Sequence, residues 1–315
     1  MKGLVLKGSN NIFYVECEDE KFRSCSIKGK VLKDSALYYN PLAAGDFVNL
    51  EPDTHSDDEG LITGLIERKN SFLRLNQKLN MPQLLAANID LLVCVVSAAN
   101  PPFRPRFVDR VLVQAEIQKI QVLIVINKCD LKISADVKER IEDWKRLGYK
   151  TIEVSAKEGR GMDNLIESLS AKTSALVGQS GVGKSTLLNF IAPDLNLKTS
   201  AISDKYDRGT HTTTQGEYFK IKALTSKGKE HSINIIDTPG VRHFAIYGIE
   251  PEDTALYFPE MEKLIGSCKF GLSCTHTHES GCALLEALKK GNIHKDRYTS
   301  FELIHKELQE TVKKY

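Results

Sequence analysis

The sequence predicts a parallel α/β domain flanked by an N-terminal β-barrel and a mainly helical C-terminal domain, and three observations lead to this prediction. Short strands separated by turn residues fill residues 1–75. From about residue 88, apolar strands alternate with segments of helical spacing, which is typical of βαβ units in a parallel sheet. Residues 246–315 hold a cysteine cluster and end in helical patterns. We therefore expect domains at 1–75, 76–245 and 246–315 of the 315-residue chain.

The N-terminal region shows β-branched and aromatic residues in rough alternation, interrupted by turn residues. The strands expected there cover residues 3–7, 12–16, 22–27, 46–50 and 61–67. Five strands in about 70 residues fit an OB-fold, which is a small closed barrel. The acidic and polar segment 52–60 is expected to be an exposed loop.

The middle region alternates between helices and strands that are apolar on both faces, as strands of a covered parallel sheet are. The expected strands cover residues 89–97, 121–127, 151–154 and 174–177, and the expected helices cover 107–119, 135–147 and 162–169. Two more helical patterns, at 282–290 and 295–313, end the chain.

The composition excludes several classes of protein. With 41% hydrophobic and 27% charged residues, the chain is neither disordered nor fibrous. The formal net charge is +2, and neither residues 1–80 (11 basic, 12 acidic) nor residues 250–315 (9 and 11) are basic, so any RNA surface must be a local patch. No apolar run approaches the ~20 residues of a membrane span, and the N-terminus lacks a signal-peptide core. We expect a cytoplasmic protein without a membrane partner.

The first strong motif is a phosphate loop that follows an expected strand and opens an expected helix. It fits the pattern G-x-x-x-x-G-K-[ST], in which successive backbone N–H groups point at phosphate oxygens. The residues expected around the phosphates are Gly178, Gln179, Ser180, Gly181, Val182, Gly183, Lys184, Ser185 and Thr186. Lys184 would bridge the β- and γ-phosphates and act in catalysis, and Ser185 would ligate Mg²⁺. A Gly-rich turn without a ligand is the alternative.

A second motif, Asp237-Thr-Pro-Gly240, ends the apolar strand 233–237. Asp237 is placed to hold Mg²⁺ directly or through water, and the N–H of Gly240 could meet the γ-phosphate. Alone, these four residues could be a strand-ending turn. Because a phosphate loop is also present, we favour the interpretation that these residues bind phosphate and magnesium over that of a turn without a ligand.

Two further motifs select the base of the nucleotide. The carboxylate of Asp130 can accept hydrogen bonds from N1 and the 2-amino group of guanine, whereas adenine offers neither donor there. Asn127 and Lys128 would brace this loop. A second loop could contact guanine O6 through its backbone, and it consists of Ser155, Ala156 and Lys157. In combination with the phosphate loop, these motifs predict GTP or GDP with Mg²⁺ as the ligand.

The motifs resemble those of Ras-like GTPases, but the guanine motifs precede the phosphate loop, as a circular permutation would leave them. Together with the barrel and the cysteine cluster, this order is similar to that of the RsgA (YjeQ) family of bacterial ribosome-assembly GTPases. The resemblance implies a GTPase that is stimulated by the small ribosomal subunit, binds its rRNA, assists its late maturation and leaves after hydrolysis. It also implies a monomer that could meet other assembly factors. In the barrel, Tyr14, Tyr38, Arg23 and Lys30 are candidate RNA contacts.

The switch region of the family resembles residues 208–214, where Thr213, or one of its neighbours, would reach Mg²⁺ and the γ-phosphate. Val241 stands where Ras-like enzymes carry a Gln that orients the attacking water. Because Val cannot bind water, His211 is our candidate for that role, and His243 is the second choice.

The cysteine cluster predicts a metal site, since disulfides are rare in a chain without a secretion signal. Three thiolates and one imidazole suit tetrahedral structural zinc. The resemblance implies the ligands Cys268, Cys274, His276 and Cys282, with His278 as an alternative to His276.

Two other functions remain open from the sequence. One is a nucleotide-gated module that binds RNA or protein with negligible turnover, which Val241 would also fit. The other is an ATPase of the same loop class, and competition between GTP and ATP distinguishes it from a GTPase.

Overall fold

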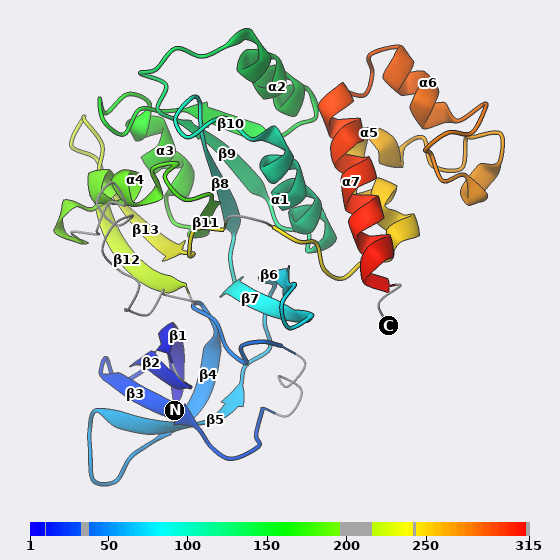
Figure 1. Cartoon of the computed structure of the whole chain (residues 1–315). Coiled ribbons are helices and arrows are strands. Elements are labelled where there is room, and N and C mark those ends of the chain that lie inside the picture. The colour runs from blue at the N-terminus through cyan, green and yellow to red at the C-terminus, as the bar shows by residue number, and fades with distance from the viewer. Residues whose placement is uncertain (10, 33–37, 196–215, 242–243, 313–315) are drawn as a thin grey trace.

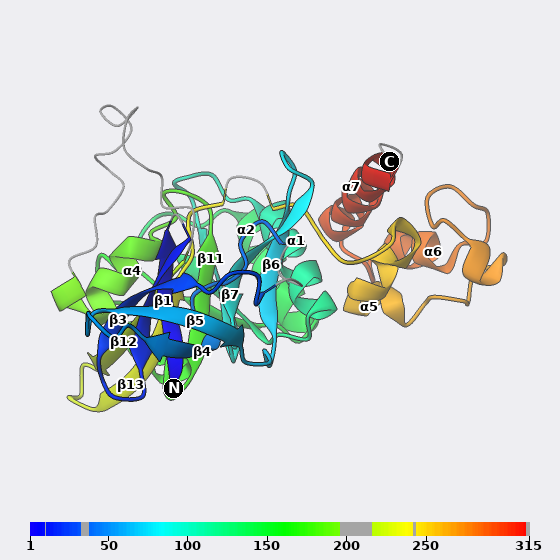
Figure 2. The same cartoon turned by 90° about the horizontal axis from the view of Figure 1, so that it is seen from below.

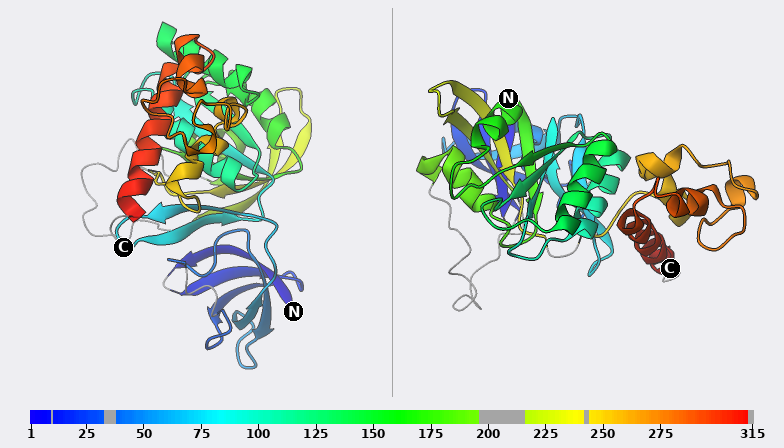
Figure 3. Two further views of the ribbon diagram at one scale, coloured as in Figure 1. Left: turned by 90° about the vertical axis from the view of Figure 1, so that its right-hand side faces the viewer. Right: turned by 90° about the horizontal axis from the view of Figure 1, so that it is seen from above.

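The computed structural model describes residues 1–9, 11–32, 38–195, 216–241 and 244–312. It contains a barrel, a six-stranded sheet with helices on both faces, and a C-terminal helical unit (Figure 1). Figures 2 and 3 show that the C-terminal unit lies beside the sheet and apart from the barrel. None of the described helices is long and apolar enough to cross a membrane.

The N-terminal strands close into a barrel, as predicted. They are β1 (Lys2–Ser9), β2 (Ile12–Cys17), β3 (Phe22–Ile27), β4 (Phe47–Pro52) and β5 (Glu59–Leu65), in the closed order β1-β2-β3-β5-β4. β3 and β5 pair in parallel and the other neighbours are antiparallel. Alternate apolar side chains, such as Val5, Phe13 and Val48, fill the interior. This arrangement fits the predicted OB type of barrel.

One expectation for the barrel surface is wrong. Arg23 is only 2% exposed, and its guanidinium donates hydrogen bonds of 2.8 and 2.6 Å to the two carboxylate oxygens of Asp19. A buried and paired arginine cannot serve as an exposed RNA contact. Tyr14 does lie at the surface, where its ring stacks on that of Phe22 at 5.7 Å.

A hairpin that the sequence pattern did not indicate connects the barrel to the sheet. Its strands are β6 (Ser71–Asn76) and β7 (Met81–Ala87). Asn40 Nδ2 donates to the Leu84 carbonyl at 3.0 Å, and Asn40 Oδ1 accepts the Leu84 N–H at 2.9 Å. Gly45 has φ +92°, and a Cβ there would come within 2.2 Å of the Ala87 carbonyl oxygen. The barrel and the hairpin are therefore joined by specific contacts.

The central sheet has the order β10-β9-β8-β11-β13-β12. Its strands are β8 (Leu91–Ser97), β9 (Val122–Asn127), β10 (Lys150–Glu153), β11 (Thr173–Gly178), β12 (Glu217–Leu224) and β13 (Glu230–Asp237). Five of them are parallel, as predicted, and β12, which was not expected, pairs antiparallel at one edge.

Helices cover both faces of the sheet. Alternate side chains of β8 pack against α1 (Pro105–Ile117) and α2 (Ala135–Arg146) on one face, and against α3 (Met162–Leu169) and α4 (Lys184–Ile191) on the other. A short 3₁₀ turn, η2 (Pro193–Leu195), follows α4. A sheet that is covered on both faces explains why its strands are apolar throughout.

The C-terminal unit contains mainly helical elements, as predicted. They are η3 (Pro251–Tyr257), α5 (Pro259–Glu262), η4 (Gly271–Ser273), α6 (Ala283–Lys289) and α7 (Lys295–Val312). The fully buried Asp109 of α1 accepts hydrogen bonds from Arg140 at 2.8 Å, from Arg297 at 3.1 Å and from Ser300 at 2.7 Å. Because the latter two belong to α7, this buried carboxylate joins the C-terminal unit to the sheet domain.

Candidate functional site

The guanine, phosphate and magnesium motifs meet at one edge of the central sheet. Asn127 ends β9, Gly178 ends β11 and Asp237 ends β13, and these strands run in the same direction. The carboxyl ends of parallel strands form the usual ligand crevice of an open α/β sheet. The permuted order of the motifs along the chain does not change this arrangement, because the position of each strand end depends on which strands are its neighbours in the sheet.

The phosphate loop is shaped by its glycines. Gly181 and Gly183 have φ values of +79° and +98°, in the region that side chains disfavour. A Cβ on Gly183 would lie 2.3 Å from Nδ2 of Asn127, so the first guanine-motif residue packs directly on the loop. The Lys184 ammonium donates to the Gly178 carbonyl at 3.1 Å, and its burial lowers its pKa. An anion between Lys184 and the loop N–H groups would relieve this burial of charge.

The loop from Asp237 to Gly240 packs on the phosphate loop. The N–H of Val241 donates to the Gly178 carbonyl at 3.2 Å, and a Cβ on Gly240 would lie 3.5 Å from the backbone of Ser180 and from Lys184 Nζ. Asp237 Oδ1 is buried and finds no hydrogen-bond partner in the part of the chain that the structure describes. This unpartnered carboxylate oxygen fits Mg²⁺, which prefers oxygen ligands.

Magnesium binding is expected to weaken below about pH 6. Burial raises the pKa of Asp237 to about 6, although the nearby Lys184 lowers it. A carboxyl must lose its proton to bind a cation, so acidification from pH 7 to 5 should reduce the affinity for Mg²⁺ in the nucleotide complex by about tenfold. Titration of Mg²⁺ into the nucleotide complex at each pH measures this. Asp237→Asn is the control, because in this variant the nucleotide phosphates still titrate but residue 237 does not. An equal pH dependence of Mg²⁺ affinity in both proteins would contradict the expectation.

The guanine loops are tied to the phosphate loop through Asn127, which is 2% exposed. Its Nδ2 donates to the Val182 carbonyl at 3.0 Å, and its Oδ1 accepts the N–H of Ala156 at 3.3 Å. Ser155 Oγ donates to Asp130 Oδ1 at 2.7 Å, and this bond is the main cause of the lowered pKa of Asp130. The carboxylate is thus held ionised at neutral pH, as an acceptor for two N–H groups must be.

The remaining motif residues are a lysine that bridges two loops, residues at or near the surface, and three residues that the structure does not describe. Lys128 Nζ donates to the Gly181 carbonyl at 2.8 Å, so its stem bridges the two loops. Ser185 is half-buried at the first turn of α4, whereas Thr186 and Lys157 are exposed. Thr213, His211 and His243 lie outside the described residues, so their roles remain predictions from the sequence.

The four predicted zinc ligands come together in the C-terminal unit. The sulfur and nitrogen atoms of Cys268, Cys274, His276 and Cys282 lie within 4.8 Å of one another, and all four residues are buried. Nδ1 of His276 is 3.4 Å from Cys268 Sγ and 3.5 Å from Cys282 Sγ. The alternative ligand His278 is exposed, and its Nδ1 faces Thr277 Oγ1 instead. The donor set and its closed geometry fit structural zinc.

Two residues that sequence reasoning missed hold the His276 loop. The Glu279 carboxylate accepts backbone N–H groups from Thr275 at 2.8 Å and from Thr277 at 3.1 Å. The Tyr298 hydroxyl, on α7, donates to the His276 carbonyl at 2.9 Å. His276 itself has φ +61°, so these bonds support a backbone shape that a ligand histidine must keep. The position of Glu279 between two cysteine ligands was the available sequence signal.

The fold and the site define a circularly permuted P-loop protein of the GTPase class. A family model described as RsgA GTPase matches residues 65–247. Small ribosomal subunit biogenesis GTPase RsgA 2 of Bacteroides thetaiotaomicron is 37% identical over 305 residues, which cover 96% of this chain and 95% of that protein. The RsgA protein of Chlorobaculum tepidum is 38% identical over 309 residues, with 96% of each chain covered. The chain therefore belongs to the RsgA GTPase family.

Solved structures agree with this assignment. YjeQ from Thermotoga maritima is 30% identical, covers 98% of each chain and has a TM-score of 0.71. YloQ, described as a circularly permuted GTPase, is 28% identical, with 98% of this chain and 95% of that chain covered and a TM-score of 0.66. The similarity extends over the barrel, the sheet domain and the C-terminal unit.

Proposed function

We propose that this protein is a GTP hydrolase that binds the small ribosomal subunit and its rRNA and assists late maturation of the subunit. The observation that supports the nucleotide part is the contact of Asn127 with both the Val182 carbonyl and the Ala156 N–H, which joins the two guanine motifs to the phosphate loop. The ribosomal part is supported by the names of the relatives, which are small ribosomal subunit biogenesis GTPases. Hydrolysis would drive release from the subunit.

In this proposal, each motif acts on a different part of GTP. Asp130 and the Ser155–Lys157 loop select guanine, and the loop from Gly178 to Thr186 holds the phosphates with Lys184 as their cation. Ser185, Asp237 and Thr213 would hold Mg²⁺, which neutralises charge that develops on the phosphates. The Gly240 N–H would meet the γ-phosphate.

The cysteine cluster would hold one structural zinc ion, because its four protein ligands leave no open position. The domain limits 1–75, 76–245 and 246–315 belong to the same proposal, as do a monomeric state, contacts with other assembly factors and a cytoplasmic location. The segment after Gly240 leads directly into the C-terminal unit, so loss of the γ-phosphate would reposition that unit.

The deciding experiment measures GTP hydrolysis by the full chain alone, with purified small subunits and with purified large subunits. We expect stimulation by small subunits only. Equal rates in all three assays would contradict the proposal and favour the nucleotide-gated binding module with negligible turnover. ATP binding as tight as GTP binding would contradict the role of Asp130 and favour an ATPase.

His211→Ala is expected to preserve GTP binding and to slow subunit-stimulated hydrolysis by about 10² or more, because a group that orients the attacking water is worth that much. Val241 cannot substitute, since it is apolar and only 2% exposed. Nucleotide affinity and single-turnover hydrolysis are measured on the same preparation. His243→Ala tests the second choice, and an unchanged rate in His211→Ala would contradict our assignment.

A further inference from the structure

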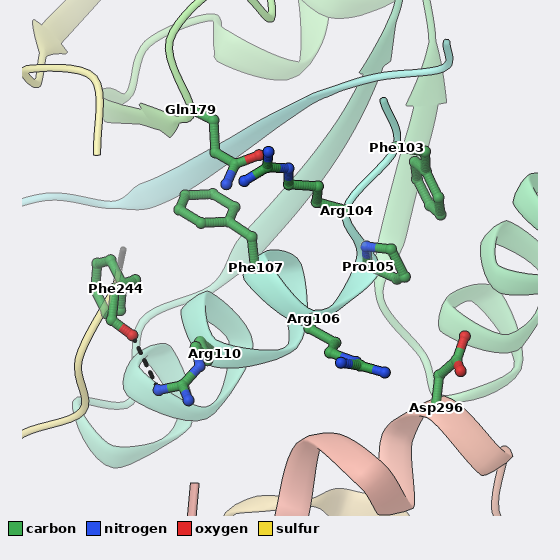
Figure 4. A pocket seen from close by; sticks show the side chains of 9 residues that line it. All are labelled: Phe103, Arg104, Pro105, Arg106, Phe107, Arg110, Gln179, Phe244 and Asp296. Carbon is green, nitrogen blue, oxygen red and sulfur yellow. Dashed lines mark hydrogen bonds between the residues drawn. The ribbon is translucent and has the colours of Figure 1, made fainter. Parts of the chain in front are cut away.

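A pocket of about 450 Å³ lies beside the phosphate loop and shares Gln179 with it. Its walls come from the start of α1, the start of α7, the phosphate-loop residue Gln179 and the buried Phe244, which follows the Asp237–Gly240 motif (Figure 4). No predicted motif accounts for it. Its size is in the range of small-ligand sites, and it would accept one nucleotide.

Arginines give the pocket a positive character. Arg104 and Arg106 are exposed, and within the described chain neither forms an ion pair. In Figure 4 the side chains of Arg104 and Gln179 point toward one another across the pocket. Arg110 is half-buried, pairs with Glu307 at 2.6 Å and donates to the Phe244 carbonyl at 3.2 Å, so it supports the wall. Asp296 is the one acidic residue among the described lining residues. Two available guanidinium groups against one carboxylate favour an anion.

Aromatic rings supply the apolar part of the pocket, and packing holds them in place. Phe107 meets Phe244 edge to face at 6.4 Å, and Phe244 stacks on Phe72 of the β6–β7 hairpin at 5.5 Å. Phe103, which is half-buried, packs against the fully buried Trp144 at 5.8 Å. Phe107 and Phe244 are buried and fix the wall of the pocket, while the half-buried Phe103 offers a ring held in place by Trp144, which lowers the entropic cost of binding.

A flat base with an attached phosphate matches this combination of groups. Single-stranded RNA is recognised through bases that stack on aromatic rings or guanidinium planes, while cations contact the backbone. A base in a duplex is stacked on its neighbours and could not enter. We propose that the pocket holds one unstacked nucleotide of single-stranded RNA, with its base on the half-buried Phe103 and its phosphate on Arg104 and Arg106. This inference rests on the proposed function and names a contact through which the chain meets rRNA.

The test measures the affinity of the full chain for a fluorescein-labelled, eight-nucleotide single-stranded RNA by anisotropy. Arg104→Glu with Arg106→Glu is expected to weaken binding at least tenfold. Phe103→Leu, which keeps the apolar volume and removes the ring, is expected to weaken it about fivefold or more, since stacking of a base on an aromatic ring contributes about 1–3 kcal/mol. The matched control is Lys227→Glu with Lys229→Glu, two exposed lysines after β12, which should change affinity less than twofold.

The outcomes separate this proposal from the function on which it rests. If both pocket variants bind the RNA with affinities within twofold of that of the unmodified chain, the pocket is not an RNA site, even if small subunits still stimulate hydrolysis. Absence of stimulation in the unmodified chain would overturn the function instead. Competition by uridine monophosphate as strong as that by the RNA would assign the pocket to free nucleotides and overturn the RNA assignment. A crosslink from 4-thiouridine RNA to the peptide containing Phe103 and Phe107 would support it.

Discussion

Asp130→Asn is expected to lower the affinity for GTP by about 10³ and to raise the affinity for xanthosine triphosphate. In the proposed site the ionised carboxylate would accept two N–H groups of guanine, and each hydrogen bond to a charged group contributes about 1.5–3 kcal/mol. An amide offers one acceptor and presents its NH₂ group to the other guanine donor. Xanthine has a carbonyl at position 2, which accepts from that NH₂. Competition of each nucleotide against a fluorescent guanine nucleotide measures both affinities.

The matched control for this prediction is Glu158→Gln. Glu158 is exposed in the loop that follows Ser155, so the substitution removes the same charge near the same loop without touching the acceptor. We expect its preference for GTP over xanthosine triphosphate to be unchanged. If Asp130→Asn also kept that preference, the base would be bound elsewhere, and the Ser155–Asp130 hydrogen bond of 2.7 Å would have only a structural role.

The nucleotide site could be anticipated because its chemistry lies in short motifs at strand ends. Asn127, Gly178 and Asp237 each end an apolar strand, and the parallel sheet brings such ends to one edge. The contact of Gly183 with Asn127 could not be anticipated, because the two residues are 56 positions apart in the chain. It is so close that a Cβ at position 183 would lie 2.3 Å from Asn127 Nδ2. Spacing predicts which side chains share an edge, whereas packing decides which of them touch.

Arg23, the β6–β7 hairpin and the pocket beside Gln179 depend on contacts that side-chain periodicity does not show. Along β3, Arg23 lies on the same face as the buried Cys25, and the carboxylate of Asp19 on the same hairpin neutralises it there. The hairpin β6–β7 contains Pro82 and several polar residues, so its pattern alone is weak, and its contacts with the barrel and with Phe244 stabilise it. The pocket beside Gln179 is built from segments distant in sequence, which no local pattern can join.

Cys282→Ser is expected to remove zinc from the chain, because a hydroxyl stays protonated at neutral pH and cannot replace a thiolate ligand. Structural zinc contributes about 10–16 kcal/mol of apparent binding free energy in small domains, so the loss should unfold part of the C-terminal unit. Elemental analysis gives the zinc content per chain. Limited proteolysis shows whether the segment from Cys268 to Cys282 becomes accessible.

The effect should reach beyond the ligands. Cys268 and Cys282 pack in the same core as Phe301 of α7, and Tyr298 of α7 binds the His276 carbonyl. Through Arg297 and Ser300, α7 in turn binds the buried Asp109 of the sheet domain. Loss of zinc should therefore loosen α7 and leave buried charges less well paired, which is costly.

Two controls make the zinc prediction decisive. Cys25→Ser changes a fully buried cysteine in the barrel, far from the cluster, and should keep one zinc ion per chain and a protease-resistant C-terminal unit. His278→Ala removes the alternative histidine and should also keep the zinc, because its ring faces Thr277. Retention of zinc by Cys282→Ser, or its loss from His278→Ala, would show that the ligand set is wrong. Loss from Cys282→Ser alone would instead make the zinc ion the link between the His276 loop and α7, and so part of the connection from the cluster to the nucleotide-binding sheet.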